Sequence, residues 1–353
     1  MKTRSLMVTL AGALALVFAV TGAAFAASSI RGGGATFSAP FWQQVGADYQ
    51  KKSGDTINYA GVGSGAGIAG FTAGTYDFGG SDVPMTKAEQ GKAQAKGIDV
   101  LHFPAILGAI TVSYNVPGLK TGLQLDGRTI ANIFLGNVTN WNDAAIKKLN
   151  PKVSLPNQAI TVIRRSDSSG TSYNFTSFLA QTSGAWRSGP GVGKTVVWPK
   201  GVGANGNPGV AAAIKQTKGA IGYVELAFAV QNQFTYASVK NQAGKYIPPT
   251  RAATAAAATG IKIPPTLKVA VVNSPNKDAY PISAASFAMV YKDPCKAGLD
   301  SGKAKALKAF LEYAVGADGQ KTAKKLLYAP LPAGLQKKTQ TAIDTLKCNG
   351  AAL

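Results

Sequence analysis

The sequence predicts a two-lobed α/β protein behind a cleaved export signal, and three observations support this. The chain has 353 residues, more than a single hydrophobic core usually organises, so two lobes are expected. Short β-branched segments such as 160–163 alternate with segments of helical periodicity such as 41–49. Strands that alternate with helices are typical of layered α/β folds, so each lobe should hold a sheet flanked by helices.

The individual elements follow from local pattern. Pro40 suits the first turn of the helix expected at 41–49, where a missing backbone N–H costs nothing. The Ala-rich segment 252–258 is either a helix or a flexible surface element. Strands are expected at 29–31, 57–59, 160–163, 220–224 and 267–272, with 77–82 as the end of a strand and a loop. Helices are expected at 41–49, from 68 onward, 172–180, 304–314 and 322–327.

The first 26 residues have the pattern of a secretory signal peptide. Lys2 and Arg4 form a basic start, 6–20 is a mostly apolar run, and Ala24-Phe25-Ala26 is a small-x-small cleavage site. A membrane anchor is the alternative, but the run is short for a span and no second apolar stretch follows. No cysteine follows the cut, so we expect a soluble, exported chain without a lipid anchor that starts near Ala27.

The mature chain is strongly basic. The whole sequence has a formal charge of +21, and removing Lys2 and Arg4 leaves 35 basic and 16 acidic residues, or +19. The lysines are scattered singly or in pairs and form no arginine-rich run, so we expect no nucleic-acid partner. A basic surface would concentrate small anions, or it could be an adaptation to an acidic medium, and the sequence leaves both open.

Cys295 and Cys348 are a disulfide candidate, because an even pair in an exported chain favours a bridge. Two free buried thiols are the alternative. The chain has one histidine, His102, so we expect no metal site and no cofactor.

One local pattern recurs three times, at 32–40, 61–67 and 164–171: a strand ends, a loop rich in Gly, Ser and Thr follows, and a helix begins. Helix N-termini carry free N–H groups and a partial positive charge, so three converging ends would form an anion cradle. Each hydroxyl taken alone is more commonly a helix N-cap. The hydroxyls and glycines concerned are Thr36, Ser64, Ser169, Thr171, Gly61, Gly63, Gly65 and Gly170.

Three charged residues beside these loops refine the prediction. Arg165 offers a planar, permanently charged fork that matches a tetrahedral oxyanion, and Asp167 stands two residues away, where it could orient that fork. Asp82 is an acid near an anion site, which makes sense if the anion carries a proton for the carboxylate to accept. Sulfate has no such proton, so Asp82 would reject it. The alternative is that Asp82 caps the turn before Pro84.

With these residues in view, the chain resembles the phosphate-binding protein of the Pst-type ABC transporter. The resemblance runs in order through nearly the whole mature chain, on segments 34–37, 59–64, 77–82, 162–172 and 219–224 with Glu225. One departure is Gly65, where the family often has a second serine. The resemblance implies that phosphate is bound by Thr36, Phe37 through its N–H, Ser64, Asp82, Arg165, Ser169, Gly170 through its N–H, and Thr171, with Asp167 holding the arginine.

The resemblance also implies a periplasmic-binding-protein-like type 2 fold, with a mixed sheet in each lobe and a hinge of two crossings near 103–106 and 280–283. Lobe I should then comprise 27–105 plus 281–353, and lobe II 106–280. The implied function is to bind inorganic phosphate in the periplasm and deliver it, as a monomer without catalysis, to the membrane permease of an ABC transporter.

Two other functions fit part of this pattern. An exported enzyme acting on phosphate esters would need an activated nucleophile or a metal cluster, and the chain offers neither pattern. A binding protein for sulfate, molybdate or an organophosphate would keep the cradle, but Asp82 argues against fully ionised oxyanions. Segments 188–195 and 65–70 approach nucleotide-binding motifs, yet each lacks the required context.

Overall fold

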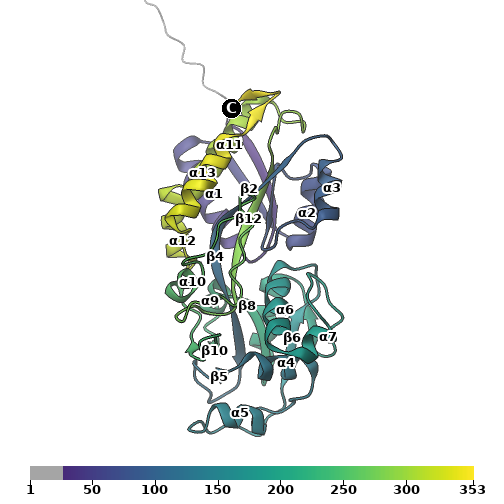
Figure 1. Cartoon of the computed structure of the whole chain (residues 1–353), viewed down its shortest axis with the longest axis vertical. Helices are drawn as coiled ribbons and strands as arrows, with labels where there is room; N and C mark the ends of the chain where they lie inside the picture. The colour runs from purple at the N-terminus through teal and green to yellow at the C-terminus, as the bar shows by residue number, and fades with distance from the viewer. Residues whose placement is uncertain (1–26) are drawn as a thin grey trace, which may run out of the picture.

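Two long antiparallel strands connect the two halves of the molecule (Figure 1). The computed structural model describes residues 27–353, so the predicted export signal lies outside the described residues. Strand β4 (Val100–Asn115) runs from the upper half into the lower half, and β12 (Ser283–Tyr291) pairs with its first part. The chain therefore enters the lower half along β4 and returns at the start of β12.

The sheet is mixed in both halves, which confirms the predicted fold class. Its strand order among the described residues is β2-β1-β3-β12-β4-β8-β6-β7, with β9 beside β4. In the upper half β1 pairs in parallel with β2 and β3, and in the lower half β6 pairs in parallel with β7 and β8. Parallel strands end at a common edge, so each half collects the loops that follow its strands. The bounds are β1 Ser29–Gly34, β2 Thr56–Gly61, β3 Phe78–Ser81, β6 Thr161–Arg165, β7 Val202–Ala204, β8 Ala220–Glu225 and β9 Thr235–Tyr236.

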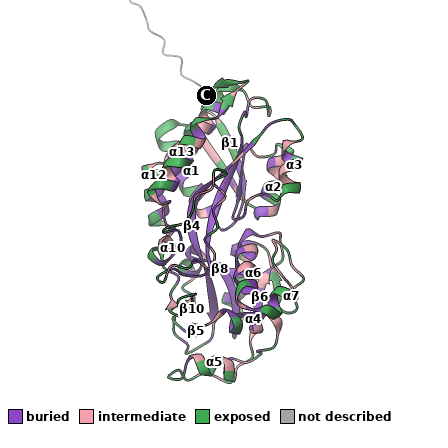
Figure 2. Ribbon diagram, viewed as in Figure 1, coloured by how far each residue is buried: buried purple, intermediate pink, exposed green. Residues whose placement is uncertain are grey.

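Helices cover the sheet on its outer sides, and the central strands are buried between them (Figure 2). The upper half carries α1 (Ala39–Ser53), α2 (Ser64–Ala73), α3 (Lys87–Gln94), α11 (Ser301–Val315), α12 (Ala317–Lys325) and α13 (Ala333–Asp344). The lower half carries α4 (Gly127–Leu135), α5 (Ala144–Leu149), α6 (Gly170–Thr182), α7 (Gly184–Ser188), α8 (Gly206–Gln216) and α9 (Leu226–Gln231), and α10 (Arg251–Ala257) packs on β4. Short strands β5 (Gln124–Leu125), β10 (Ser238–Lys240) and β11 (Tyr246–Ile247) form a separate sheet, and β13 (Lys347–Cys348) pairs with β14 (Ala351–Ala352).

Aromatic side chains form much of the core in each half. In the upper half Trp42 packs against Phe78 and Phe310, with ring centroids 5.1 and 6.1 Å away. In the lower half Tyr223 stacks on Phe175 at 4.2 Å. Such pairs stabilise beyond the area that they bury. The Tyr223 hydroxyl in this core accepts the backbone N–H of Arg165 at 3.2 Å, so the aromatic core helps to hold the end of β6.

Most of the predicted elements are present, but the prediction of a strand at 267–272 is wrong. That segment is irregular, although Leu267, Val269 and Val271 are buried in alternation as a strand would bury them. Pro264 and Pro265 precede it, and Leu267 takes a positive φ of 57°, which breaks an extended ladder. The alternation therefore reflected packing on the core and not pairing with another strand.

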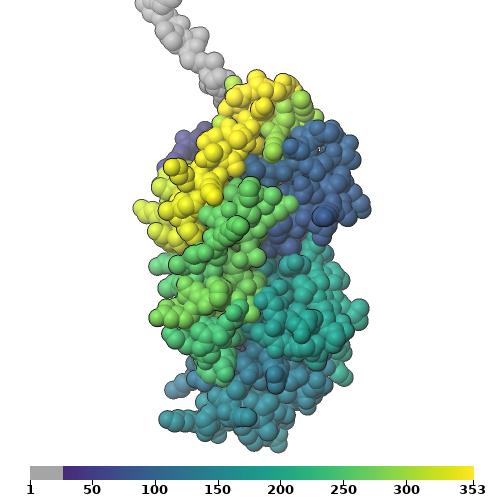
Figure 3. All heavy atoms as spheres, in the orientation of Figure 1, coloured from purple at the N-terminus to yellow at the C-terminus, as the bar shows by residue number. Residues whose placement is uncertain are grey.

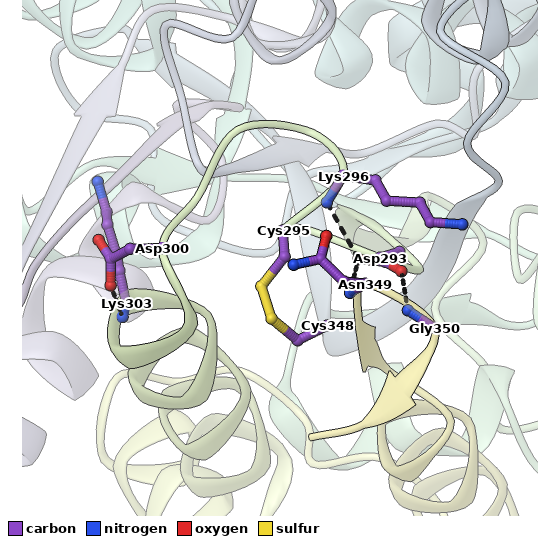
Figure 4. Close-up of a disulfide and its surroundings, with 8 residues drawn as sticks. All are labelled: Asp293, Cys295, Lys296, Asp300, Lys303, Cys348, Asn349 and Gly350. Carbon is purple, nitrogen blue, oxygen red and sulfur yellow. Dashed lines mark hydrogen bonds between the residues drawn. A yellow bond between two sulfur atoms is a disulfide. The ribbon is translucent and has the colours of Figure 1, made fainter.

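No helix in the described part of the chain is both long and apolar enough to span a membrane. At the upper end, the structure joins Cys295 and Cys348 by a disulfide across a separation of 53 residues (Figure 4). Next to the bridge, the Asp293 carboxylate accepts backbone N–H groups from Asn349 and Gly350. The bridge and this carboxylate fix the C-terminal hairpin to the turn before α11.

Replacing both cysteines, Cys295→Ser with Cys348→Ser, should lower the free energy of unfolding by about 4 kcal/mol, since the bridge restricts a long loop in the unfolded chain. Denaturant unfolding with and without a thiol reductant measures this. The reductant should destabilise the wild type to a similar extent and leave the double variant unchanged. Equal stability of all four samples would show that the bridge contributes nothing.

Candidate anion-binding site

Four helix N-termini meet where the two halves touch. Helices α1 and α2 follow strands β1 and β2 of the upper half, and α6 and α8 follow β6 and β7 of the lower half. Residues in or just before their first turns contact one another across the junction: the Gly170 N–H donates to Ser64 Oγ, and the Asn207 amide donates to Thr36 Oγ1. The first N–H groups of each helix have no partner within the helix, so four partial positive charges converge there.

Ser64, the first residue of α2, links the two halves directly. Its Oγ accepts hydrogen bonds from the backbone N–H groups of Asp82 and Gly170, both at 3.2 Å. A second link joins the Gly65 N–H to the Ser168 carbonyl at 2.9 Å. Gly170 is required at this junction, because a Cβ there would lie 2.5 Å from Ser64 Oγ. The halves are therefore in contact at the site, and the space-filling view shows the two halves packed against each other (Figure 3).

Arg165 is held rigidly at the end of β6. Its Nε donates to Asp167 Oδ1 at 2.6 Å, and its Nη2 donates to the other carboxylate oxygen, which forms a bidentate pair. Burial raises the pKa of Asp167, but the hydrogen bond and charge of Arg165 outweigh it and leave that pKa below its ordinary value. The guanidinium side chain is 1% exposed, and its Nη1 points to Thr171 Oγ1 at 3.4 Å. Nη1 is thus the edge that the arginine presents to the site.

Asp82 is a buried carboxyl at the end of β3. Its Oδ1 accepts the Ser286 hydroxyl at 2.8 Å, and its backbone carbonyl accepts the Asn174 amide at 2.8 Å. Burial raises the pKa of Asp82 to about 7, although Ser286, Arg165 and Thr171 oppose the rise. Near neutral pH this carboxyl can therefore accept a proton or a hydrogen bond, the property that a partly protonated anion would use.

Asn207, in the first turn of α8, connects hydroxyls from both halves. Its Nδ2 donates to Thr36 Oγ1 at 3.0 Å and to Thr171 Oγ1 at 3.2 Å. Its Oδ1 accepts the backbone N–H of Glu225 at 3.0 Å. Thr36, Thr171 and Glu225, the three residues that Asn207 bonds to, are all buried, so water does not compete for these hydrogen bonds.

A second buried carboxyl lies behind the first loop. Tyr328 donates its hydroxyl to the Phe37 carbonyl at 2.6 Å and lies 3.3 Å from Glu225 Oε2. The N–H of Ala227 also donates to that oxygen, at 2.7 Å. Burial is the main cause that raises the pKa of Glu225 well above its ordinary value. Burial therefore favours the protonated form of Glu225, and through Tyr328 this carboxyl helps to fix the loop that contains Phe37.

The structure brings the sequence-predicted site residues together. Ser169 caps α6 by accepting the Ser172 N–H at 3.0 Å, which is the alternative noted for each hydroxyl, and its backbone N–H donates to the Lys194 carbonyl. Cys295 and Cys348 lie at the far end of the upper half. The residues gathered at the junction are Thr36, Phe37, Ser64, Asp82, Arg165, Asp167, Ser169, Gly170 and Thr171.

Sequence reasoning missed Asn207, Ser286 and Glu225 as members of this network. A signal existed for Asn207, because a short strand, the segment 205–207 and a helix repeat the strand–loop–helix pattern a fourth time. Ser286 had no local signal, since it lies in the middle of β12. Among the residues that the structure describes, no cluster of His, Cys, Asp and Glu could hold a metal ion.

This fold and site define a two-lobed binding protein, and comparison with known proteins agrees. Residues 19–318 match the model of the PBP superfamily domain. The chain is 40% identical over 314 residues to the phosphate-binding protein PstS of Xylella fastidiosa, covering 88% of this chain and 84% of that one. The chain therefore belongs to the family of the phosphate-binding protein PstS.

Solved structures support the same fold. One is a high affinity periplasmic phosphate-binding protein, PfluDING, with a TM-score of 0.74 and 21% identity, covering 92% of this chain and 99% of that chain. Another is an ABC-type phosphate transport receptor from Vibrio cholerae, with a TM-score of 0.55 and 20% identity, covering 86% of this chain and all of that chain.

Glu225→Gln should stabilise the protein increasingly as the pH rises. The unfolded carboxyl ionises near its ordinary pKa of 4.5, while burial makes the folded one ionise only at a higher pH, so the wild type loses stability as the pH rises above 4.5. Glutamine keeps a neutral hydrogen-bonding group and avoids this loss. Denaturant unfolding from pH 4 to pH 8 measures the difference.

Glu89→Gln is the matched control, because Glu89 has a lowered pKa through its bonds to Lys194 and Thr86, although burial opposes the shift. The pH trend of this variant should be opposite to that of Glu225→Gln. The ionised Glu89 stabilises the fold above its unfolded pKa, so the free energy of unfolding of Glu89→Gln should fall below that of the wild type as the pH rises. The same pH trend in both variants would contradict the assigned state of Glu225.

Proposed function

We propose that this protein binds inorganic phosphate between its two halves in the periplasm and delivers it to the permease of an ABC transporter. One observation carries the proposal: donors from four helix starts and an arginine gather at the junction of the halves together with the buried carboxyl of Asp82. The membership in the PstS family and the names of its relatives support the choice of ligand.

The donors suit a tetrahedral oxyanion. Arg165 presents Nη1, and the three predicted loops add the hydroxyls of Thr36, Ser64, Ser169 and Thr171 and the N–H of Phe37. The N–H of Gly170 donates to Ser64 Oγ in this structure, so it would reach the anion only by sharing that hydrogen. Because Asp167 neutralises the arginine, the site would hold its anion by local hydrogen bonds and helix dipoles and not by excess charge. Such bonds are directional, so they favour one anion geometry.

Asp82 supplies the selectivity in this proposal. An ionised Asp82 can accept the proton that HPO₄²⁻ or H₂PO₄⁻ carries. Sulfate at neutral pH would place an oxygen lone pair against the carboxylate, and in a buried site this costs several kcal/mol. The Ser286 hydroxyl bound to Oδ1 would hold the carboxyl in position and leave Oδ2 for the ligand.

Delivery would depend on opening and closing. We assign residues 27–105 with 281–353 to one lobe and 106–280 to the other, with the hinge at the crossings along β4 and β12. An ion pair between Lys194 and Glu89 links the lobes beside the Ser169 loop, so closure and ligand contact would occur together. The permease would recognise the closed form, and the protein would act as a monomer without catalysis and without a nucleic-acid partner.

The test is calorimetric titration of the mature, ligand-stripped protein with phosphate and, separately, with sulfate at neutral pH. Tight one-to-one binding of phosphate with no heat from sulfate is the expected result. Binding of neither anion would contradict the proposal, and equal binding of both would show that the cradle is correct but that Asp82 does not select.

Arg165→Ala should weaken phosphate binding at least about 100-fold, because charge-assisted hydrogen bonds in a dry site are lost and Asp167 is left unpaired. Equilibrium titration measures the Kd. Arg164→Ala is the control, because Arg164 lies on the same strand but packs over Trp198 at 6.0 Å. Similar affinities in the two variants would remove Arg165 from the site.

Asp82→Asn should narrow the preference for phosphate over sulfate by at least about tenfold, because the amide can donate to either anion. The ratio of the two Kd values is the measurement. Asp293→Asn, at the remote C-terminal hairpin, should leave that ratio unchanged. An unaltered ratio in Asp82→Asn would mean that the carboxyl has only a structural role.

A further inference from the structure

We propose that Asn207 is a positioning residue that forces the hydroxyls of Thr36 and Thr171 to act as donors toward the bound anion. The inference rests on the proposed phosphate binding at this site and adds a residue that sets the direction of its hydrogen bonds. It follows from counting the hydrogens and lone pairs that each group has available.

The orientation of the Asn207 amide is fixed by the backbone. A backbone N–H can only donate, so the atom 3.0 Å from the Glu225 nitrogen must be the carbonyl oxygen of the Asn207 side chain. The NH₂ group therefore faces the two threonines. Its two hydrogens are directed to Thr36 Oγ1 at 3.0 Å and to Thr171 Oγ1 at 3.2 Å.

Both threonine oxygens are then fully used as acceptors. Thr36 Oγ1 also accepts the backbone N–H of Asn207 at 3.1 Å, and Thr171 Oγ1 also accepts Arg165 Nη1 at 3.4 Å. A hydroxyl has two lone pairs and one hydrogen. With both lone pairs occupied, each threonine can offer only its hydrogen to a further partner. For Thr171 the Asp82 carboxyl competes with the anion for that hydrogen, because a hydrogen bond from Thr171 is one of the causes that oppose the raised pKa of Asp82.

This arrangement matters because a hydroxyl can otherwise act either as a donor or as an acceptor. A freely rotating hydroxyl could turn a lone pair toward the anion, which would repel it, and fixing the hydrogen at binding would cost entropy. Asn207 lies in the same half as Thr171, so it can remove that choice for Thr171 before the ligand arrives, and it does so for Thr36 as the halves close. Since Thr36 belongs to the upper half and Thr171 to the lower half, the amide can direct both hydroxyls only when the halves are closed.

The first experiment compares the phosphate Kd of the wild type, Asn207→Asp and Asn207→Leu by calorimetry. Asn207→Asp keeps the size and the bond to Glu225 but turns a donor into an acceptor, so both hydroxyls would donate to it and not to phosphate. Asn207→Leu removes the donor without adding charge. We expect at least about 100-fold weaker binding in each variant, since two hydrogen bonds to a charged ligand are affected.

Asn150 provides a matched control at a site remote from the anion. Its Oδ1 also accepts a backbone N–H, from Gln124 at 2.8 Å, and its Nδ2 donates to the carbonyls of Gln124 and Ile146. Asn150→Asp and Asn150→Leu should therefore lower the melting temperature of the ligand-free protein and leave its phosphate Kd unchanged. A Kd loss in the Asn150 variants as large as that in the Asn207 variants would overturn the proposal.

A double-mutant cycle separates positioning from a general structural role. If Asn207 acts through the two threonines, Asn207→Leu should raise the phosphate Kd less than about threefold when Thr36→Val and Thr171→Val are already present. Should the leucine variant fail to fold, Asn207→Asp replaces it in the same cycle. An equal fold-loss in both backgrounds, or near-wild-type affinity of Asn207→Leu alone, would overturn the proposal. A wild type that binds no phosphate would overturn the proposed function itself.

Discussion

Two backbone N–H groups donate to Ser64 Oγ and occupy both lone pairs of this oxygen, and the site depends on this constraint. One comes from Asp82 in the same half and the other from Gly170 in the opposite half, so a single oxygen joins three chain segments. Because both lone pairs of that oxygen are occupied, its hydrogen is the only bond left to offer. The same condition holds for Thr36 and Thr171. Three hydroxyls without remaining acceptor capacity suit a site for an anion, and for Ser64 and Thr36 the contact between the halves creates that condition.

The carboxyl of Asp82 is the acceptor that this site offers to a ligand. Asp82 is surrounded by groups that stabilise its ionised form, yet burial outweighs them and raises its pKa to about 7. Arg165 contributes less net charge than its presence suggests, since Asp167 holds two of its nitrogens. The balance explains how a buried site can accept an anion without an excess of positive charge. Recognition is then a matter of which atoms carry hydrogens, and a single proton on the ligand decides whether it fits Asp82.

The sequence predicted the three loops well because their signal is local. Glycines permit close backbone approach, hydroxyls precede helices, and Arg165 with Asp167 stands at a strand end, so each loop could be recognised from a few consecutive residues. Ser286 could not be predicted, because its contact with Asp82 spans 204 residues and depends on the register of β12. Asn207 follows a strand of only three small residues, too short for periodicity to identify. The segment 267–272 failed for the opposite reason: its alternation was real, but two prolines and a left-handed Leu267 kept it out of a sheet.

The most direct test of this account is a crystal structure of the mature protein with phosphate, at a resolution that reveals hydrogen positions on the ligand and the hydroxyls. We predict one phosphate oxygen, bearing the proton, within hydrogen-bond distance of Asp82, while the other three oxygens contact only donors, including the hydroxyls of Thr36, Ser64 and Thr171. A bound phosphate that does not touch Asp82, or that donates its proton to one of those hydroxyls, would contradict the account.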